Sequence, residues 1–239
     1  MSHAFLLNWF DLPVENEAAF DKWHNRQHVI ERLCIPGFEA GRRYAAIDNP
    51  VERGHGYLVI YDAESTQVLE SPDYAARLDA PTPLTRSVVP MLRDLTRTVG
   101  ELVQERGTGM GSFLSTIRLP ELSAWFMDSS SSVHEALNSM YEVDSVTRVQ
   151  LYRPDARITH FKDKTQEGRS TDTLRKDNYP WGIVVEGCRP QALDSATEVL
   201  RRLLDDRLGG GATRFECHTY RLVFTMSAHE ARLVPGGLV

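Results

Sequence analysis

Hydrophobic residues follow two different spacings along the chain. Short apolar runs rich in strand-forming residues alternate with longer segments whose apolar positions recur at helical spacing. The second helical region contains Pro81, Pro83 and Pro90, so it must consist of at least two pieces. For the first half, the pattern predicts strand 4–11, helix 15–34, strand 38–47, strand 56–62, a broken helical region 71–97 and strand 98–104.

The same order of elements starts again after the glycine-rich segment Gly107–Gly111, which we expect to be a flexible joint. Residues 154–180 interrupt the second series as a polar insertion. An insertion of this length is expected to be a mobile loop or a lid. For the second half, the pattern predicts strand 112–119, helix 131–140, strand 145–153, strand 181–186, helix 191–208 and strand 215–226.

Each half therefore has the element order of a ferredoxin-like βαββαβ unit, although the halves share no obvious residue identity. Such a sheet carries helices on one face and leaves the other face bare. Two four-stranded sheets can cover each other within one chain. We therefore predict an α+β protein whose tandem ferredoxin-like halves, residues 1–107 and 108–239, form one α/β barrel. Because this pairing buries both sheets, we expect a monomer, or a homodimer formed through helices or edges.

Composition narrows the function classes. The chain has 239 residues, a net charge of −6 and no dominant basic patch, so nucleic acid is not an expected partner. No apolar run is long enough to span a membrane. The N-terminal segment is too short and too polar for a signal peptide. The three dispersed cysteines, Cys34, Cys188 and Cys217, indicate a reducing compartment, so we expect the cytoplasm.

The densest chemical signal lies in the first helix. His24 and His28 are four residues apart and project from neighbouring turns, and Glu31 lies near the same face. A half-buried imidazole beside a carboxylate can move protons near neutral pH. We therefore take His28 as a candidate catalytic base, with His24 or Glu31 as its support. The alternative is that all three are boundary residues that bond to the backbone at the rim of a pocket.

Other chemistries find little support in the sequence. Two histidines at this spacing fit half of a zinc site, but Asn25 follows His24, so HExxH is absent, and no third ligand is evident. The chain has no P-loop, no dinucleotide-binding glycine motif after a strand and no GxSxG elbow. His134, His160 and His218 are expected to be structural or solvated. We therefore expect neither a metal nor a cofactor.

The segments FDKWHNRQHVIERLCIPGFEAGRRY and SPDYAARLDAPTPLTRSVVPMLRDLTR resemble the first helix, second strand and second helix of the dimeric α/β barrel superfamily. They are most similar to EthD-like proteins and related uncharacterised bacterial proteins. The resemblance covers residues 5–106. The superfamily includes cofactor-free monooxygenases, isomerases, polyketide cyclases and haem enzymes, so it indicates fold more than activity. The second-helix histidine expected of haem enzymes is missing between residues 71 and 97.

The resemblance also implies site residues. His28 matches the helix histidine that would face a cavity between helices and sheet. Arg42, Arg43 and Tyr44 match the arginine-tyrosine strand, with Arg42 and Tyr44 on one face and Arg43 on the other. One arginine would hold an anionic or enolate oxygen. The alternative is a salt bridge to Glu31 or Asp48.

Three aromatic residues are candidates for the walls of a pocket for a flat ligand, or for plain core: Trp9, Trp23 and Tyr57. The sequence thus favours a cofactor-independent enzyme acting on a small apolar or aromatic molecule by proton transfer. Isomerisation, dehydration or cyclisation, and oxygenation all remain open. The alternative is a non-catalytic small-molecule-binding or structural protein.

Overall fold

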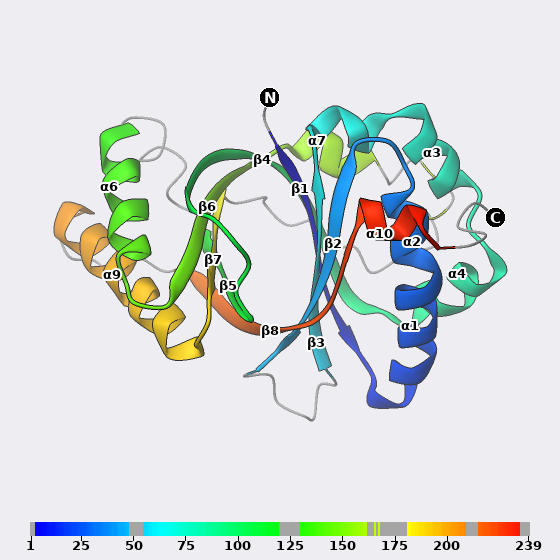
Figure 1. Cartoon of the computed structure of the whole chain (residues 1–239), viewed down its shortest axis with the longest axis horizontal. Helices are drawn as coiled ribbons and strands as arrows, with labels where there is room; N and C mark the ends of the chain where they lie inside the picture. Colours follow the sequence, from blue (N-terminus) through cyan, green and yellow to red (C-terminus); the bar gives the residue numbers. More distant parts are fainter. Residues whose placement is uncertain are drawn as a thin grey trace. The chain divides into compact units, whose positions relative to one another are not determined.

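The computed structural model describes residues 3–47, 55–119, 130–161, 165, 167, 181–208 and 215–234 (Figure 1). Its contacts divide the chain into two compact units. The first comprises Met1–Glu101, Asp155–Asp177 and Val223–Val239, and the second comprises Leu102–Pro154 and Asn178–Leu222. Within the described residues, no helix is long and apolar enough to cross a membrane.

The first unit contains the sheet and helices predicted for the first half. Its first helical region is one continuous rod in three parts, α1, η2 and α2, and its second region is broken as the prolines require. The elements are β1 (Ala4–Leu12), η1 (Val14–Asn16), α1 (Glu17–Trp23), η2 (His24–His28), α2 (Val29–Leu33), β2 (Phe38–Ala46), β3 (His55–Ala63), η4 (Thr66–Glu70), α3 (Pro72–Asp79), α4 (Pro83–Val88), η5 (Val89–Met91), the first part of β4 (Arg93–Gly107), α7 (Ala156–Thr159), the end of β8 (Glu216–Ser227) and α10 (Ala228–Arg232).

The second unit contains two long helices, α6 and α9, beside its strands. The elements are the end of β4, then β5 (Phe113–Leu119), α6 (Ser130–Tyr141), β6 (Val146–Pro154), β7 (Trp181–Gly187), α9 (Pro190–Leu208) and the start of β8. Both units therefore follow the predicted strand and helix order.

Strand order explains how the elements combine. In the first unit the antiparallel order is β4-β1-β3-β2, and in the second it is β8-β5-β7-β6. The prediction of an α+β fold that closes as a barrel is confirmed, because the eight strands form one closed hydrogen-bonded order. All eight strands belong to this one closed order, so the strands of each half do not form a separate sheet. β4 has 15 residues and β8 has 12, so each is long enough to take part in both units.

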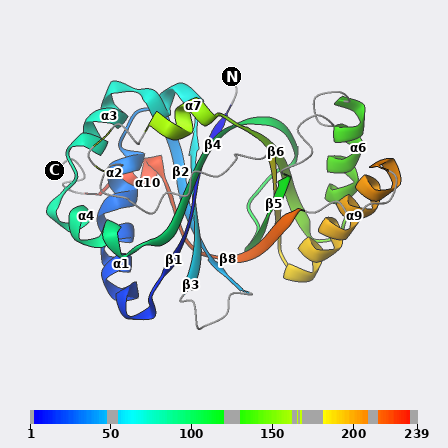
Figure 2. The same ribbon diagram turned by 180° about the vertical axis from the view of Figure 1, so that it is seen from behind.

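Each sheet buries one face beneath its own helices. Figures 1 and 2 show α1, α2, α4 and α10 on one side of the β1–β3–β2 sheet, and α6 and α9 on one side of the β5–β7–β6 sheet. In the first unit, alternate residues of β1 and β3 such as Phe10, Val59 and Tyr61 join the core beneath the helices. Leu7 and Leu58 are buried on the opposite face. This alternation determines which side chains can reach the helical layer.

One irregularity of the first sheet lies beside the helical layer. The β1–β4 register shifts between Trp9 and Asp11, because β4 contains an extra residue there. Asp94, at the start of β4, has a positive φ of 49°. Bulges of this kind bend a strand and redirect its side chains, and they occur often beside functional sites.

Two short helices differ from the sequence prediction. Residues 156–159 were expected to belong to a polar loop, but they form α7, where the Ile158 N–H donates to the capping side chain of Asp155 over 3.0 Å. α10 follows β8 and begins with a capping box in which Ser227 and Glu230 satisfy each other's backbone N–H groups. The Ser-x-x-Glu spacing was a signal for this helix that the sequence analysis did not use.

The tight turn before β2 generates a testable prediction. Gly37 has φ +91°, and a Cβ placed there would lie 2.4 Å from a methyl of Val68. We expect Gly37→Ala to lower the free energy of unfolding by about 2–4 kcal/mol. The cost of a left-handed backbone at alanine is added to that of the steric clash between its Cβ and Val68. Urea denaturation measures the change.

Gly109 provides the matched control, because it has φ +90° and a Cβ placed there would meet nothing within 4 Å. We expect Gly109→Ala to cost only the backbone strain, about 1 kcal/mol. Equal losses in the two variants would show that the contact with Val68 contributes nothing.

Candidate functional site

The first helical rod contains a wide turn at its centre. Between α1 and α2, residues His24–His28 form a π-helix in which the Val29 N–H donates to the His24 carbonyl, five residues back. A π-helical turn of this kind inside an α-helix is rare and is frequently found at functional sites. Regular helical spacing over residues 15–34 does not predict such a turn. His24 lies at the first position of this turn and His28 at its last.

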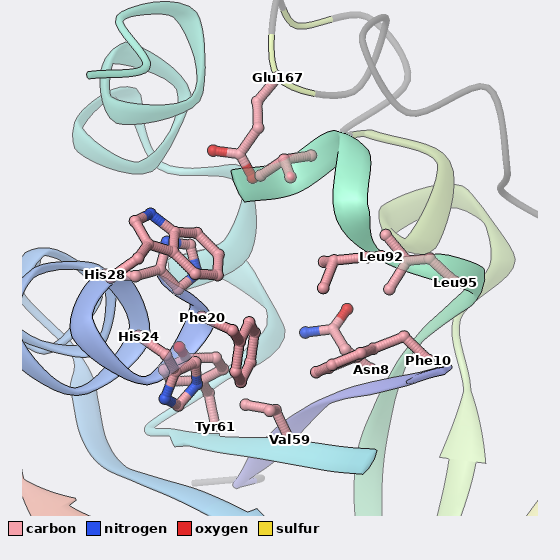
Figure 3. Close-up of a pocket in the computed structure, with 12 residues that line it drawn as sticks. Asn8, Phe10, Phe20, His24, His28, Val59, Tyr61, Leu92, Leu95 and Glu167 are labelled. Carbon is pink, nitrogen blue, oxygen red and sulfur yellow. The ribbon is translucent and has the colours of Figure 1, made fainter. Parts of the chain in front are cut away.

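The side chains of α1 and η2 line a cavity beneath the helical layer, with a volume of about 50 Å³. Figure 3 shows His24 and His28 on one side of it, Leu92 and Leu95 on the other, and Glu167 above. The space admits a few water-sized groups, and it is smaller than the roughly 300–1,000 Å³ typical of pockets for drug-sized ligands. The lining residues are Asn8, Phe10, Phe20, Trp23, His24, His28, Val59, Tyr61, Val89, Leu92, Leu95 and Glu167.

His24 is the most deeply buried histidine of the site, with 2% of its surface exposed. Its ring stacks on Phe20 at 5.2 Å, and its Nδ1 lies 3.3 Å from Oδ1 of Asn25. Burial, reinforced by the positive charge of Arg43, lowers the pKa of His24 to about 3. His24 is therefore neutral at physiological pH. A group with so low a pKa is a poor general base and a good hydrogen-bonding group.

His28 is half-buried and contacts an anchored aromatic ring. Its ring lies 4.2 Å from that of Trp23, centroid to centroid. The Trp23 indole N–H donates to Oγ1 of Thr85 over 3.0 Å, which fixes the indole against α4. The His28 ring is also 6.1 Å from His24 and 6.4 Å from Tyr61. Of the two helix histidines, His28 is the more exposed.

Sequence reasoning missed two polar residues of the cavity wall on the strands. Asn8 interrupts the apolar run of β1, and Tyr61 shares a face of β3 with Val59. Tyr61 is 1% exposed, and burial raises the pKa of its phenol. A polar residue within an apolar strand was the available signal for Asn8. The period of two along GYLVIYD was the signal for Tyr61.

Glu167 is the third missed residue, and nothing in the sequence indicated it. It belongs to the insertion, and its carboxylate accepts a hydrogen bond from Arg32 of α2 over 2.5 Å. Both side chains are nearly fully buried, and the Arg32 guanidinium also lies over the ring of Tyr74 at 5.6 Å. The insertion was expected to be a mobile loop or lid. Within it, Glu167 is instead anchored beside the cavity by a buried ion pair.

Glu31 does not share the cavity with the histidines. It lines a separate groove with Cys34 and Arg77, and it lies 3.8 Å from the Arg77 guanidinium. Gln27 donates a hydrogen bond to it over 3.0 Å. Because the wide turn shifts the residues that follow it, the regular helical angles used for Glu31 do not apply. A direct role beside His28 therefore has no geometric support.

The arginine-tyrosine strand splits between the two faces of the sheet, as the alternation predicted. Arg42 donates to Tyr44 over 3.3 Å and to Asp62 over 2.7 Å. Arg43 lies on the helical side, where it donates to Asp21 over 2.7 Å and stacks over Phe20. Both arginines form ion pairs, Arg42 with Asp62 and Arg43 with Asp21. Asp48 lies outside the described residues.

Of the three aromatic candidates, only Trp23 lines the cavity. Trp9 follows Asn8 and precedes Phe10 on β1, so it lies on the opposite face of the strand. Tyr57 packs beneath α1, where its hydroxyl donates to Glu17 over 2.7 Å. The flat aromatic pocket expected from these residues is therefore replaced by a smaller cavity lined by Phe10, Phe20 and aliphatic side chains.

Comparisons with known proteins identify the fold. No protein-family model matches the sequence, and no curated protein matches it. Many solved structures are similar, among them three that cover most of both chains. An anthrone oxidase-like protein has 13% identity and a TM-score of 0.58, with 96% of this chain and 94% of that one covered.

A candidate monooxygenase from Lactobacillus acidophilus has 9% identity and a TM-score of 0.58, covering 95% and 97%. A haem-binding protein from Thermus thermophilus has 11% identity and a TM-score of 0.53, covering 97% and 94%. At these identities the similarity establishes the fold alone. The chain has the dimeric α/β barrel, ferredoxin-like fold, as the sequence resemblance implied.

The similarity in fold to a haem-binding protein raises the question of whether this chain fits a haem. The cavity beside His24 and His28 holds about 50 Å³, which is far too little for a porphyrin. In the described part of the second unit, His134 and His218 are both exposed. Among the described residues, no group of three His, Cys, Asp or Glu side chains is arranged to hold a metal ion. The candidate site therefore does not fit a haem.

Burial of neutral His24 predicts a pH dependence of stability. Its pKa is about 3 in the folded protein and 6.5 in the unfolded chain, so between these values the unfolded state binds more protons. As the pH falls from 6.5 towards 3, His24 alone should lower the free energy of unfolding by about 1.4 kcal/mol per pH unit.

His24→Phe should remove this contribution and make the free energy of unfolding depend less on pH. The carboxylates contribute equally to both proteins, so the difference between the two profiles isolates His24. Urea denaturation at pH 7, 6, 5 and 4 measures the difference. Parallel pH profiles for the variant and the wild type would mean that the histidine is solvated.

Because Arg32 and Glu167 form a buried ion pair, we expect the effects of substituting them on the free energy of unfolding to be strongly non-additive. Arg32→Met leaves a buried carboxylate without its cation, so we expect a loss of about 3–5 kcal/mol in the free energy of unfolding. Glu167→Gln should also destabilise the protein. The double variant should lose clearly less than the sum, because neither charge is then left uncompensated. Additive losses in denaturant unfolding would contradict the buried pairing.

Proposed function

We propose that this protein is a small-molecule enzyme of the monooxygenase-like kind, in which His28 removes a proton from an apolar substrate without a bound cofactor. The observation that carries the proposal is the π-helical turn, which places His28 half-buried at the edge of a mainly apolar cavity. Similarity in fold to an anthrone oxidase-like protein and a candidate monooxygenase supports it.

The two histidines have different roles in this proposal. A general base works best when its pKa lies near the operating pH, and His24 is far below that range. His28 therefore accepts the proton. The substrate C–H bond breaks, its electron pair stays on the substrate as an enolate, and His28 becomes an imidazolium. Apolar groups such as Leu92 and Leu95 exclude water from the reacting carbon.

Three reaction types share this first step. Return of the proton to another carbon gives isomerisation, and loss of hydroxide gives dehydration. Transfer of electrons to dioxygen gives oxidation, in which a CH₂ group and one O₂ yield a C=O group and water. The similar proteins favour the third outcome. Only the substrate edge that carries the acidic C–H needs to enter the cavity of about 50 Å³.

Anthrone is a suitable first probe, because it carries an acidic CH₂ group and a similar structure is described as anthrone oxidase-like. We expect the wild type to accelerate exchange of this CH₂ with deuterium oxide under anaerobic conditions, measured by proton NMR. His28→Gln should slow the enzymatic exchange by about 10²–10⁴-fold, since the base is lost. Oxygen uptake in air then tests the oxidative step separately.

His134→Ala is the matched control, since this exposed histidine belongs to the second unit and does not line the cavity. It should leave the exchange rate unchanged. If His28→Gln retains the wild-type rate, His28 is not the base. If the wild type accelerates no exchange while it binds anthrone, the chain is a binding protein and not an enzyme.

A further inference from the structure

His24 and Tyr61 each have an unsatisfied buried polar atom, and both residues line the cavity. Among the described residues, neither Nε2 of His24 nor the hydroxyl oxygen of Tyr61 has a hydrogen-bond partner. Both side chains are almost fully buried, and both line the cavity. An unmet buried polar group is costly, and its usual explanation in a native protein is a bound water or a ligand. The His28 ring is near both side chains, with its centroid 6.1 Å from that of His24 and 6.4 Å from that of Tyr61.

The protons on these two groups are set by their surroundings. Nδ1 of His24 faces the Asn25 side-chain oxygen, so in the neutral ring Nδ1 carries the proton and donates. Nε2 is then an acceptor. The buried Tyr61 phenol keeps its proton, because burial disfavours the phenolate, so its hydroxyl donates. The cavity wall therefore presents one acceptor and one donor.

A hydroxyl group matches this pair, because it donates one hydrogen bond and accepts another. A carboxylate cannot donate to Nε2, and an ammonium cannot accept from Tyr61. The nearby cations Arg32 and Arg43 are paired with Glu167 and Asp21 and do not line the cavity.

We propose that His24 and Tyr61 form a subsite for an uncharged hydroxyl group, so that the ligand of this cavity is a neutral phenol or enol. The subsite deepens the proposed function and rests on it for its place beside His28. A phenol or enol hydroxyl held here lies next to the proposed base, and its aromatic or vinylic carbons meet Phe10 and Val59. Water is the competing occupant of the same two atoms.

The test uses three probes of similar size: phenol, its methyl ether anisole, and benzoate. Isothermal titration calorimetry on the full chain measures binding at millimolar probe concentrations. We expect the wild type to bind phenol about tenfold more tightly than anisole, since the ether cannot donate to Nε2, and to bind benzoate more weakly still. Equal affinities for phenol and anisole, or no binding of phenol, would overturn the proposal.

Variants then assign the effect to the two residues. Tyr61→Phe should weaken phenol binding about fivefold to tenfold and leave anisole almost unchanged. Because it removes a hydroxyl without a partner, it should not lower the melting temperature. His24→Phe should also abolish the preference for phenol. Tyr152→Phe is the matched control, since Tyr152 is a buried tyrosine of the second unit that does not line the cavity. A loss of preference in the control, or none in Tyr61→Phe, would contradict the subsite.

The outcomes separate the subsite from the proposed function. His28→Gln should still prefer phenol over anisole while it loses proton exchange on anthrone. If proton exchange on anthrone depends on His28 but the wild type binds phenol and anisole equally, the subsite is wrong and the proposed activity is supported. If the probes are discriminated and no exchange occurs, the subsite is confirmed and the proposed activity is wrong.

Discussion

The wide turn from His24 to His28 determines which side chains share the candidate site. In a regular α-helix, four residues advance by roughly 40° beyond a full turn, so successive i and i+4 residues drift round the surface. The π-helical turn resets this drift, and Phe20, His24 and His28 all reach one cavity. The same turn moves Glu31 to a different groove. The shared position of Phe20, His24 and His28 on the cavity wall thus depends on one irregularity of the backbone.

Ion pairs compensate the charges around the cavity, including that of Glu167 on its wall. Arg32, Arg42 and Arg43 are each buried and each bonded to a carboxylate. Their positive charges therefore remain behind the wall, where Arg43 helps to keep His24 neutral. The result is a mainly apolar cavity whose polar atoms are chiefly uncharged. Such a site favours removal of a proton from a neutral molecule over recognition of an anion.

The sequence predicted the fold better than the site, for physical reasons. Strand and helix order follows from local spacing, and one face of each strand from the period of two, so β1, β3 and the split of Arg42 from Arg43 were predictable. The π-helical turn depends on packing against the sheet, and regular spacing conceals it. Glu167 is 135 residues from Arg32 in the chain, and its place beside the cavity is a tertiary contact without a local signal.

The two units share backbone features that do not by themselves produce the candidate site. Both have a strand bulge one residue after the start of the second strand, at Glu39 and Thr147, and both have a positive φ just before that strand, at Gly37 and Ser145. This agreement supports the predicted tandem halves, which stay a prediction.

Counted back from these equivalent turns, the positions of His24 and His28 correspond to Ser132 and Ala136. α6, which carries them, is an α-helix without a π-helical turn. The second unit thus repeats the strand framework and lacks both histidines and the wide turn. If the fold alone produced the cavity, both units would carry its chemistry. Since, within the described residues, the first unit alone has the turn, the histidines and the Arg32–Glu167 pair, the candidate chemistry depends on these local additions to a common framework.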